Sequence, residues 1–379
     1  MVARPATATP AQPTGSGRGR QPMATPVATV APSIGLCRLP SGSRVAYATL
    51  GQGPPLVMVP GWLSHLERVW THPAARSARD KLAAAHRFVW YDRLGCGLSD
   101  RVGFTPSIDN DVEQLEAVLD ATGVERCSLI GYSFGGPAAA TLAARHPERV
   151  DRLVLYSTYA RGRALASDGQ HEALKALIRG NWALGTRALA TLFVPNGSPQ
   201  DVSWFRRFQR DAATAEMAVT LLDAMRTHDA REALVQVRAP TLVLTNRHDP
   251  ACNPDNSREV AALVPGAILH ILDGNEHEPF IRDSGSVVEA ILDFVERRPL
   301  TSPTLDVAPP ALALSPRETE VLRLLAAGEA NKVIAGRLGI GVATVERHVA
   351  SIYRKLGARG RADAALHAVA LGLVAVPVR

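Results

Sequence analysis

Short apolar runs alternate with amphipathic stretches through the middle of this chain of 379 residues. The runs are rich in β-branched residues, a pattern typical of strands. The predicted strands occupy residues 44–50, 56–60, 87–91, 127–130, 150–156, 241–245 and 267–272. Helical periodicity fills most of the intervals between them. This alternation predicts an α/β fold, with a mostly parallel sheet that helices cover on both faces.

Residues 161–236 interrupt this alternation, because they show helical periodicity alone. Apolar residues recur there at helical spacing, as at Leu174 and Leu177. We interpret the segment as a helical cap inserted into the α/β core. Its aromatic side chains either line an apolar substrate pocket or pack the cap itself. The sequence leaves both interpretations open for Trp182, Phe193, Trp204, Phe205 and Phe208.

Changes in composition divide the chain into four predicted parts. Residues 1–33 consist largely of Ala, Thr, Pro, Gly and Gln, which predicts a disordered arm. Residues 34–297 form the α/β domain, and a Pro-rich linker at 298–311 joins it to a C-terminal domain at 312–379. No run approaches 18 apolar residues and the N-terminus has no apolar signal region. We therefore expect no membrane span and a cytoplasmic protein.

The net charge of +6 is concentrated at the two ends of the chain. Residues 312–379 hold ten Lys and Arg against five Asp and Glu, and residues 1–33 hold three Arg without an acid, which leaves −2 for residues 34–311. This asymmetry is expected if only the C-terminal domain meets phosphate. The four cysteines show no CxxC spacing, and no cluster of metal ligands stands out. We expect free, buried thiols, no bound metal and no cofactor.

The strongest chemical motif is Gly131-x-Ser133-x-Gly135. It joins the predicted strand at 127–130 to a helix that stops before Pro147. A sharp strand-to-helix turn strains its central residue and crowds its neighbours, so it requires small residues two positions before and after the serine. The turn presents Ser133 Oγ at a helix N-terminus, where the helix dipole favours negative charge. We therefore predict that Ser133 is a catalytic nucleophile.

The partners of such a serine are expected in the order serine, acid, histidine. Asp249 and His277 each follow a predicted strand, so both belong to loops at the carboxyl edge of the sheet. We predict that His277 takes the serine proton and that Asp249 holds the imidazole in the required tautomer. The loop after strand 150–156 offers no carboxylate before Asp168, which favours Asp249 as the acid.

An oxyanion hole needs two backbone N–H donors. We assign them to Phe134, directly after the serine, and to Trp62, in the loop after the predicted strand at 56–60.

With these motifs, residues 34–297 outside the cap resemble the α/β-hydrolase family. The segment Asp92-Arg93-Leu94-Gly95-Cys96-Gly97-Leu98-Ser99 and the helix end His146-Pro147-Glu148-Arg149-Val150 are similar to that family's patterns. The family often has His-Gly where Pro60-Gly61 stands in this chain. The resemblance implies the α/β-hydrolase fold and a Ser-His-Asp triad.

The C-terminal domain shows the pattern of four helices. The first begins at a capping box, Ser315-Pro316-Arg317-Glu318, and has a buried stripe at 321–325. A second helix is predicted at 331–338, a third at 342–356 and a fourth at about 362–371. The third helix turns a polar and basic surface outward, which fits a DNA groove. Its members are Thr344, Arg347, His348, Ser351, Arg354 and Lys355.

Residues 314–374 resemble the LuxR/FixJ-type helix-turn-helix family. The resemblance is carried by the capping box, Asn331-Lys332-x-Ile334-Ala335, Thr344-Val345-x-x-His348 and Lys355-Leu356-Gly357-x-Arg359. It implies that the protein binds double-stranded DNA as a homodimer, with the third helix in the major groove.

The resemblance also implies roles for single residues. Lys332, Thr344, His348 and Lys355 would contact mainly phosphates, which position a protein without reading sequence. Glu346, Arg347 and Ala350 would face base edges. Arg347 would read guanine with both guanidinium donors, which contributes ~1–3 kcal/mol of discrimination. Glu346 stands where the family often has Lys, and it either accepts from cytosine or lowers the affinity.

Together the two halves resemble bacterial transcriptional regulators with an α/β-hydrolase sensor. We rank three hypotheses. In the first, the hydrolase-like domain binds a small ester, lactone or acyl ligand and alters DNA binding. In the second, the protein is also a working serine hydrolase that acts on its own signal. In the third, it is chiefly an enzyme, and the DNA-binding domain only localises it.

Overall fold

The computed structural model describes residues 1, 31–282, 284–296, 315–356, 361, 364 and 368, with the backbone alone at residues 284 and 354–356. Residues 2–30 of the predicted arm and the whole predicted linker at 298–311 lie outside the described residues.

The α/β domain is built on one twisted sheet, which has eight strands in the described part of the chain. In spatial order these are β1 (Ser33–Arg38), β2 (Arg44–Leu50), β4 (Arg87–Tyr91), β3 (Pro55–Val59), β5 (Cys127–Tyr132), β6 (Val150–Tyr156), β7 (Thr241–Asn246) and β8 (Ile268–Leu272). The β1–β2 and β2–β4 pairs are antiparallel, and every pair from β4–β3 to β7–β8 is parallel. The mostly parallel sheet and all seven predicted strands are therefore confirmed, with ends displaced by at most two residues.

Strand β1 was not predicted, because it lies at the sheet edge and lacks a regularly buried face. Ile34 and Leu36 are exposed, and only Cys37 of this strand is buried. The strand forms through its backbone, which pairs with β2 along its full length. Gly35 faces Tyr47 of β2, and a Cβ at this glycine would lie 2.5 Å from the tyrosine ring. Strand periodicity needs one buried face, so this element leaves no clear signal in the sequence.

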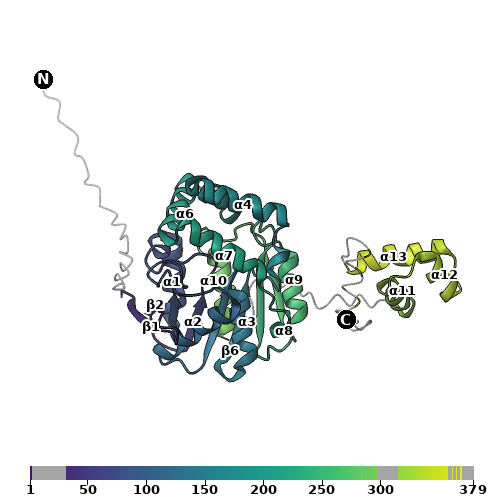
Figure 1. Ribbon diagram of the computed structural model, residues 1–379, viewed down its shortest axis with the longest axis horizontal. Coiled ribbons are helices and arrows are strands. Elements are labelled where there is room, and N and C mark those ends of the chain that lie inside the picture. The colour runs from purple at the N-terminus through teal and green to yellow at the C-terminus, as the bar shows by residue number, and fades with distance from the viewer. Residues whose placement is uncertain are drawn as a thin grey trace. The chain divides into compact units, whose positions relative to one another are not determined.

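Helices cover both faces of the sheet (Figure 1). The helices α1 (Pro73–Ala85) and α10 (Ser284–Val295) enclose one apolar cluster with Leu56, Phe88 and Trp90. The helices on the other face are α2 (Ile108–Ala121), α3 (Gly135–Arg145) and α9 (Pro254–Leu263). Short 3-10 turns lie at η1 (Val69–Thr71) and η2 (Pro147–Arg149).

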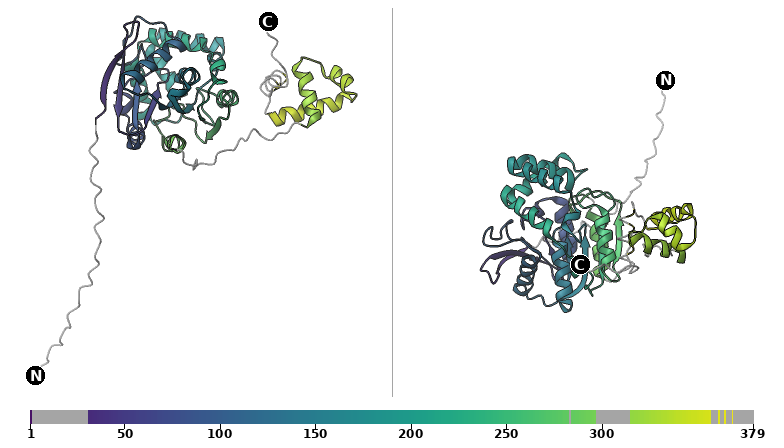
Figure 2. Two further views of the ribbon diagram at one scale, coloured as in Figure 1. Left: turned by 90° about the horizontal axis from the view of Figure 1, so that it is seen from below. Right: turned by 45° about the vertical axis from the view of Figure 1, so that its right-hand side comes forward.

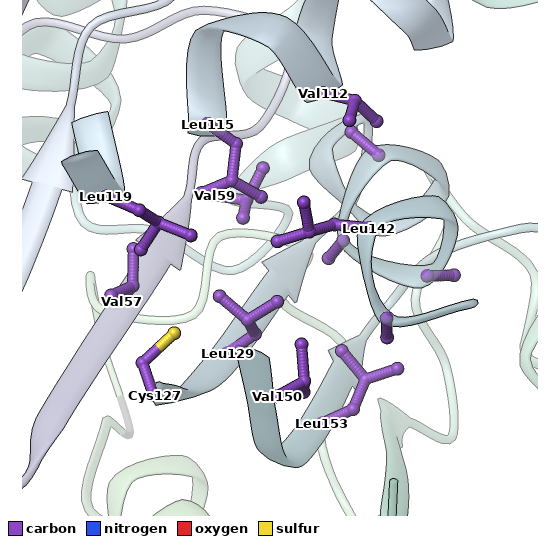
Figure 3. Packing of buried hydrophobic residues seen from close by; sticks show 14 of the residues in the cluster. Val57, Val59, Val112, Leu115, Leu119, Cys127, Leu129, Leu142, Val150 and Leu153 are labelled. Atoms are coloured by element: carbon purple, nitrogen blue, oxygen red, sulfur yellow. The ribbon is translucent and has the colours of Figure 1, made fainter. Parts of the chain in front are cut away.

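Figure 3 shows the second cluster, where side chains of β3, β5 and β6 interdigitate with those of α2 and α3. Leu129 lies at its centre and is fully buried. Strand β5 is buried at all six positions, as expected for a strand in the middle of a covered parallel sheet. This buried strand leads directly into the Ser133 turn.

The predicted cap is a set of helices between β6 and β7. They are η3 (Gly162–Ala164), α4 (Asp168–Gly180), α5 (Trp182–Phe193), α6 (Pro199–Ala212) and α7 (Ala215–Thr227). The prediction also placed α8 (Arg231–Leu234) in the cap, but its Leu234 packs on the sheet in the cluster with α2 and α3. Figures 1 and 2 show the teal helices of this segment gathered on one side of the α/β layers. The chain enters and leaves the cap side by side, since the N–H of Ala230 donates to the carbonyl of Ala160 at 2.8 Å.

The C-terminal domain contains α11 (Pro316–Ala326), α12 (Asn331–Leu338) and α13 (Val342–Leu356), which confirms three predicted helices. The capping box is present, because Ser315 Oγ accepts from the N–H of Glu318 while the Glu318 carboxylate accepts from the N–H of Ser315. Val321, Ile334 and Val345 join the three helices in one core. The predicted fourth helix lies mostly outside the described residues, although Ala364 and Ala368 are buried in this core.

Within the ranges described, no helix is both long and apolar enough to cross a membrane. All four cysteines are free and buried, as expected.

We predict that Leu129→Ala destabilises the α/β domain by about 2–5 kcal/mol, because it removes a buried side chain and leaves a cavity. Chemical denaturation of the full chain measures this loss. The matched control is Leu184→Ala on the cap surface, where the side chain is half exposed, and it should change stability by about 0.5 kcal/mol or less. Equal losses in the two variants would contradict the core assignment of Leu129.

Candidate functional site

Ser133 forms the turn between β5 and α3 in a strained conformation. Its φ is +50°, in the left-handed region that side chains other than glycine rarely adopt. The backbone on both sides is fixed, because the N–H of Ser133 donates to the carbonyl of Tyr156 at 2.9 Å and its carbonyl accepts from Thr158 Oγ1 at 2.6 Å. The strain is thus held by the neighbouring strand β6.

The glycines around Ser133 are required by close contacts. A Cβ at Gly131 would lie 2.7 Å from the Cβ of Ala139 in α3. A Cβ at Gly135 would lie 2.6 Å from the carbonyl oxygens of Val59 and Pro60. The backbone carbonyls and the Cβ of Ala139 cannot move aside without a shift of the main chain, so the crowding predicted from the motif is present.

The structure brings Ser133, His277 and Asp249 together in one hydrogen-bonded chain. His277 Nε2 lies 2.9 Å from Ser133 Oγ, and His277 Nδ1 lies 2.8 Å from Asp249 Oδ2. All three residues are buried. Since Asp249 only accepts, Nδ1 carries the proton and Nε2 is free to accept from the serine hydroxyl. This is the arrangement that a histidine base needs.

Asp249 is held by a turn of its own. Its second oxygen, Oδ1, accepts from the backbone N–H groups of Ala251 and Cys252 at 2.9 and 3.0 Å. Both oxygens of this buried carboxylate therefore have donors, which stabilises its charge. The loop after β6, the other position considered for the acid, instead supplies Ser157 and Thr158 behind the serine turn.

The two residues expected to form the oxyanion hole are both buried beneath the cap. Phe134 is fully buried, and Trp62 is anchored by its indole N–H, which donates to the carbonyl of Ala218 in α7 at 3.3 Å. Both side chains belong to one apolar cluster with cap residues such as Leu189 and Leu222. The two residues predicted to form the oxyanion hole are therefore also residues that pack against the cap.

A buried cation lies behind Phe134, and sequence reasoning did not find it. The Arg93 guanidinium lies 3.8 Å from the centre of the Phe134 ring and forms a 3.0 Å ion pair with Asp111. The His228 ring meets the edge of Phe134 at 4.7 Å. Burial, aided by the charge of Arg93, lowers the pKa of His228 to about 3, so this ring is neutral near pH 7. The motif at 92–99 contained Arg93, but only packing shows what it touches.

The cap also contacts the histidine loop directly, through Phe193 at the end of α5. The Phe193 carbonyl accepts from the N–H of His277 at 3.1 Å and from the N–H of Glu278 at 3.2 Å. The Phe193 ring meets the His277 ring edge-on at 4.8 Å. This end of α5 therefore contacts His277 through both its backbone and its side chain.

The cap aromatics pack in two neighbouring apolar clusters. Phe205, Phe208 and Trp204 stack on one another in a separate apolar cluster, so they pack the cap. Trp182 and Phe193 pack against the cluster that contains Trp62 and Phe134, and Phe193 also stacks on Phe205 at 5.6 Å.

The C-terminal helices expose most of the predicted DNA-contacting residues. Glu346, Arg347 and Ala350 are exposed on α13, and Lys332 is exposed on α12. Thr344 and His348 are half-buried. The side chain of Lys355 lies outside the described residues.

The structure corrects the prediction for Ser351, which was placed on the outer surface of the third helix. Ser351 is half-buried, and its hydroxyl donates to Glu318 Oε1 of α11 at 2.7 Å. Glu318 thus serves the capping box with one oxygen and holds α13 with the other. Helical periodicity gave the direction of Ser351 but not the neighbouring helix that covers it.

One group of possible metal ligands occurs among the described residues: His171, Glu172 and Asp223 in the cap. Lys175 already lies within this group, 2.6 Å from Asp223 and 3.0 Å from Glu172. Its ammonium supplies the positive charge that these carboxylates need, so the group is explained as an ion-pair network.

Comparison with known proteins supports both halves of the chain. The family described as alpha/beta hydrolase fold matches residues 54–284, which is more than half of the chain. The family described as bacterial regulatory proteins, luxR family, matches residues 312–368.

Individual relatives match the hydrolase part. The polyketide synthase ThaQ of Burkholderia thailandensis is 28% identical over 281 residues, which is 69% of this chain but only 13% of that much longer protein. The pimeloyl-(acyl-carrier protein) methyl ester esterase of Aliivibrio salmonicida is 24% identical over 262 residues, 66% of this chain and 95% of that protein. An esterase structure from Exiguobacterium antarcticum superposes with a TM-score of 0.62 at 19% identity, covering 69% of this chain and 98% of the esterase. The structural likeness shows the fold.

We predict that Gly135→Ala disrupts the serine turn, because its Cβ would collide with the carbonyls of Val59 and Pro60. The expected result is loss of Ser133 reactivity toward a fluorophosphonate, together with a lower melting temperature. The control is Gly169→Ala in α4, where no atom lies within 4 Å of the new Cβ. If the fluorophosphonate labelled Gly135→Ala as fast as Gly169→Ala, the close contact at Gly135 would not be required for the reactivity of Ser133.

Proposed function

Because this chain belongs to the alpha/beta hydrolase fold family and ends in a DNA-binding domain of the luxR family of bacterial regulators, we propose that it is a transcriptional regulator whose hydrolase domain senses a small ester, lactone or acyl ligand. The observation that carries the proposal is the Ser133–His277–Asp249 chain, assembled beneath a cap in the same protein as a DNA-binding domain.

The chemistry around Ser133 favours an acyl ligand with an apolar chain. The cap meets the serine turn through an apolar cluster that includes Trp62, Phe134, Ile178 and Leu189. The polar groups converge on one point, the serine hydroxyl. A site with an apolar wall and a few convergent polar groups suits a small ester or lactone. The methyl ester esterase named above acts on a related class of bond.

The same geometry supports a second candidate function, active serine hydrolysis. In this mechanism Ser133 Oγ attacks the ester carbonyl while His277 Nε2 accepts its proton, and Asp249 stabilises the resulting imidazolium. The N–H groups of Trp62 and Phe134 would stabilise the oxyanion. Collapse expels the alcohol, which takes the proton from His277, and leaves an acylated serine. Water then attacks this ester with His277 as base, which releases the acid and restores the serine.

Ligand sensing and turnover are compatible, because both act through the cap. A ligand that separates the cap from the serine must displace side chains next to Trp62 and Phe134. Phe193 would carry that displacement to the His277 loop through its two backbone hydrogen bonds. Hydrolysis would end the signal by removing the ligand. The alternative hypothesis, that the protein is chiefly an enzyme, differs from this proposal because it treats DNA binding as secondary to hydrolysis.

The DNA-binding half would act through α13 in the major groove, as a homodimer. Arg347, Glu346 and Lys332 are exposed. In this proposal Arg347 and Glu346 would meet base edges, and Lys332 would meet phosphate. Since the target is chromosomal DNA, we place the protein in the cytoplasm.

We predict that a fluorophosphonate labels the wild-type protein and fails to label Ser133→Ala. The reason is that only a serine with an adjacent base attacks the phosphorus rapidly. Gel fluorescence or intact-protein mass spectrometry measures the label, and circular dichroism checks that the variant is folded. Well-folded wild-type protein that takes up no label would contradict turnover and would favour a purely receptor-like pocket.

We predict that Arg347→Ala weakens binding to the specific operator by about 1–3 kcal/mol while leaving Ser133 labelling unchanged. A gel-shift or fluorescence anisotropy titration measures the affinity. Arg337→Ala on α12 is the control, because this arginine pairs with Glu329 at 3.1 Å. For the wild type, the logarithm of affinity should fall linearly with the logarithm of salt concentration. Unchanged operator affinity in Arg347→Ala would remove this residue from base reading.

A further inference from the structure

A hydrogen bond joins the residue before the predicted nucleophile to the residue after the predicted base. The Tyr132 hydroxyl donates to Glu278 Oε2 at 2.9 Å. Tyr132 precedes Ser133 at the end of β5, and Glu278 follows His277 in the loop after β8. The two residues are 146 positions apart in the chain. The bond therefore joins the same two segments of the chain as the Ser133–His277 contact. It does so through the residue before the serine and the residue after the histidine.

The Tyr132–Glu278 bond lies against the histidine ring. The Tyr132 ring centre is 5.5 Å from that of His277, and Tyr132 is buried. Burial raises the pKa of the Glu278 carboxyl, while the Tyr132 hydroxyl and a positive charge on His277 oppose that rise. The Phe193 carbonyl holds the backbone of Glu278 from the cap side at 3.2 Å. Glu278 is thus fixed at both its side chain and its main chain.

The charged and titratable groups around Glu278 come from several elements. A cavity of about 450 Å³ opens beside it, behind the histidine loop, and its lining includes Asn246, Glu276 and Arg282. Arg282 lies 3.4 Å from Glu276, so the carboxylate of Glu276 already has a cationic partner. The titratable groups near Glu278 and His277 are Tyr132 of β5, Tyr156 of β6, His248 and Asp249 after β7, and Glu276 and Arg282 around the loop. Asp273 also lines the cavity, but its side chain is mostly exposed and pairs with Arg247 at 2.8 Å. The lining residues Ser286 and Val287 of α10 are uncharged, as are Phe193 and Asn196 of the cap.

We propose that Tyr132 and Glu278 form a positioning pair for the base. The pair holds His277 at hydrogen-bond distance from Ser133, and the Glu278 carboxylate adds negative charge beside the imidazolium that forms when the serine attacks. This inference rests on the proposed hydrolase function of the triad. This role differs from that of Asp249, because the ring nitrogens of His277 are hydrogen-bonded to Asp249 and Ser133 and not to Glu278. Glu278 acts by holding the histidine loop in position and through the electric field of its carboxylate.

The first test is the pH dependence of fluorophosphonate labelling in Glu278→Gln. Glutamine preserves an acceptor for the Tyr132 hydroxyl and removes the charge. A nearby negative charge favours the protonated imidazole, so its removal should let His277 become a neutral base at lower pH. We expect the midpoint of the pH–rate profile to fall by about 0.5–1 pH unit, and the plateau rate to fall about tenfold.

The second test uses the tyrosine. Tyr132→Phe removes the hydroxyl and keeps the ring, so it should lower the plateau rate several-fold with a smaller displacement of the midpoint. The rate loss in the double variant should be smaller than the product of the two single losses, because both changes act on the same pair. The matched control is Tyr159→Phe, a buried tyrosine whose hydroxyl contacts His228 at 3.2 Å instead of the histidine loop. Its midpoint should equal that of the wild type.

A readout independent of turnover separates the two proposals. The ring nitrogens of His277 can be titrated by NMR in histidine-labelled wild type, Glu278→Gln and Tyr132→Phe, with melting curves as a check on folding. A wild type that takes no label, but whose His277 titration midpoint falls in Glu278→Gln, would reject hydrolysis and keep the positioning pair. Identical His277 midpoints in wild type and both folded variants, or multiplicative effects in the double variant, would overturn the pair.

Discussion

The candidate site depends on one strained residue, Ser133. Its left-handed backbone costs about 1–3 kcal/mol, and the surrounding structure must supply that energy. Strand β5 is buried at every position, α3 packs on it through Gly131 and Ala139, and Thr158 binds the serine carbonyl. The strain has a use, because it turns the serine hydroxyl out of the sheet toward His277. The core around β5 is thus what makes the triad possible.

The rest of the site is coupled to the cap. Phe193 reaches His277 through its carbonyl and its ring, while Trp62 and Phe134 lie in the apolar cluster that the cap completes. Arg93 and His228 support Phe134 from behind, and His228 belongs to the segment in which the chain leaves the cap. Under the proposed function, a ligand in this space would act on the base and on the predicted oxyanion donors at once. That coupling is the physical basis of the proposed recognition and cleavage of an acyl compound.

The DNA-binding domain has a separate apolar core, which joins α11, α12 and α13. Glu318 has two roles in this domain, because it caps α11 and also binds Ser351 of α13. This contact ties α13 to α11, and Arg347 and Glu346, the predicted base-reading residues, are exposed on α13. A regulator needs such rigidity, because a base-reading side chain works only from a well-placed helix.

The sequence by itself determined the parts of this protein that depend on local patterns. These patterns are the periodicity of strands and helices, the capping box at Ser315 and the glycine spacing around Ser133. Each involves residues that are close in the chain, so it can be recognised from the sequence alone. Ser133, Asp249 and His277 each follow a strand of the parallel sheet, in the order serine, acid, histidine, and this was enough to predict that they would meet. Tertiary structure decided the contacts between distant segments: the pairing of β1, the cover over Ser351, and the placement of Arg93, Phe193 and Glu278 around the triad. These contacts arise from how helices and strands pack, and packing partners leave no fixed spacing in the sequence.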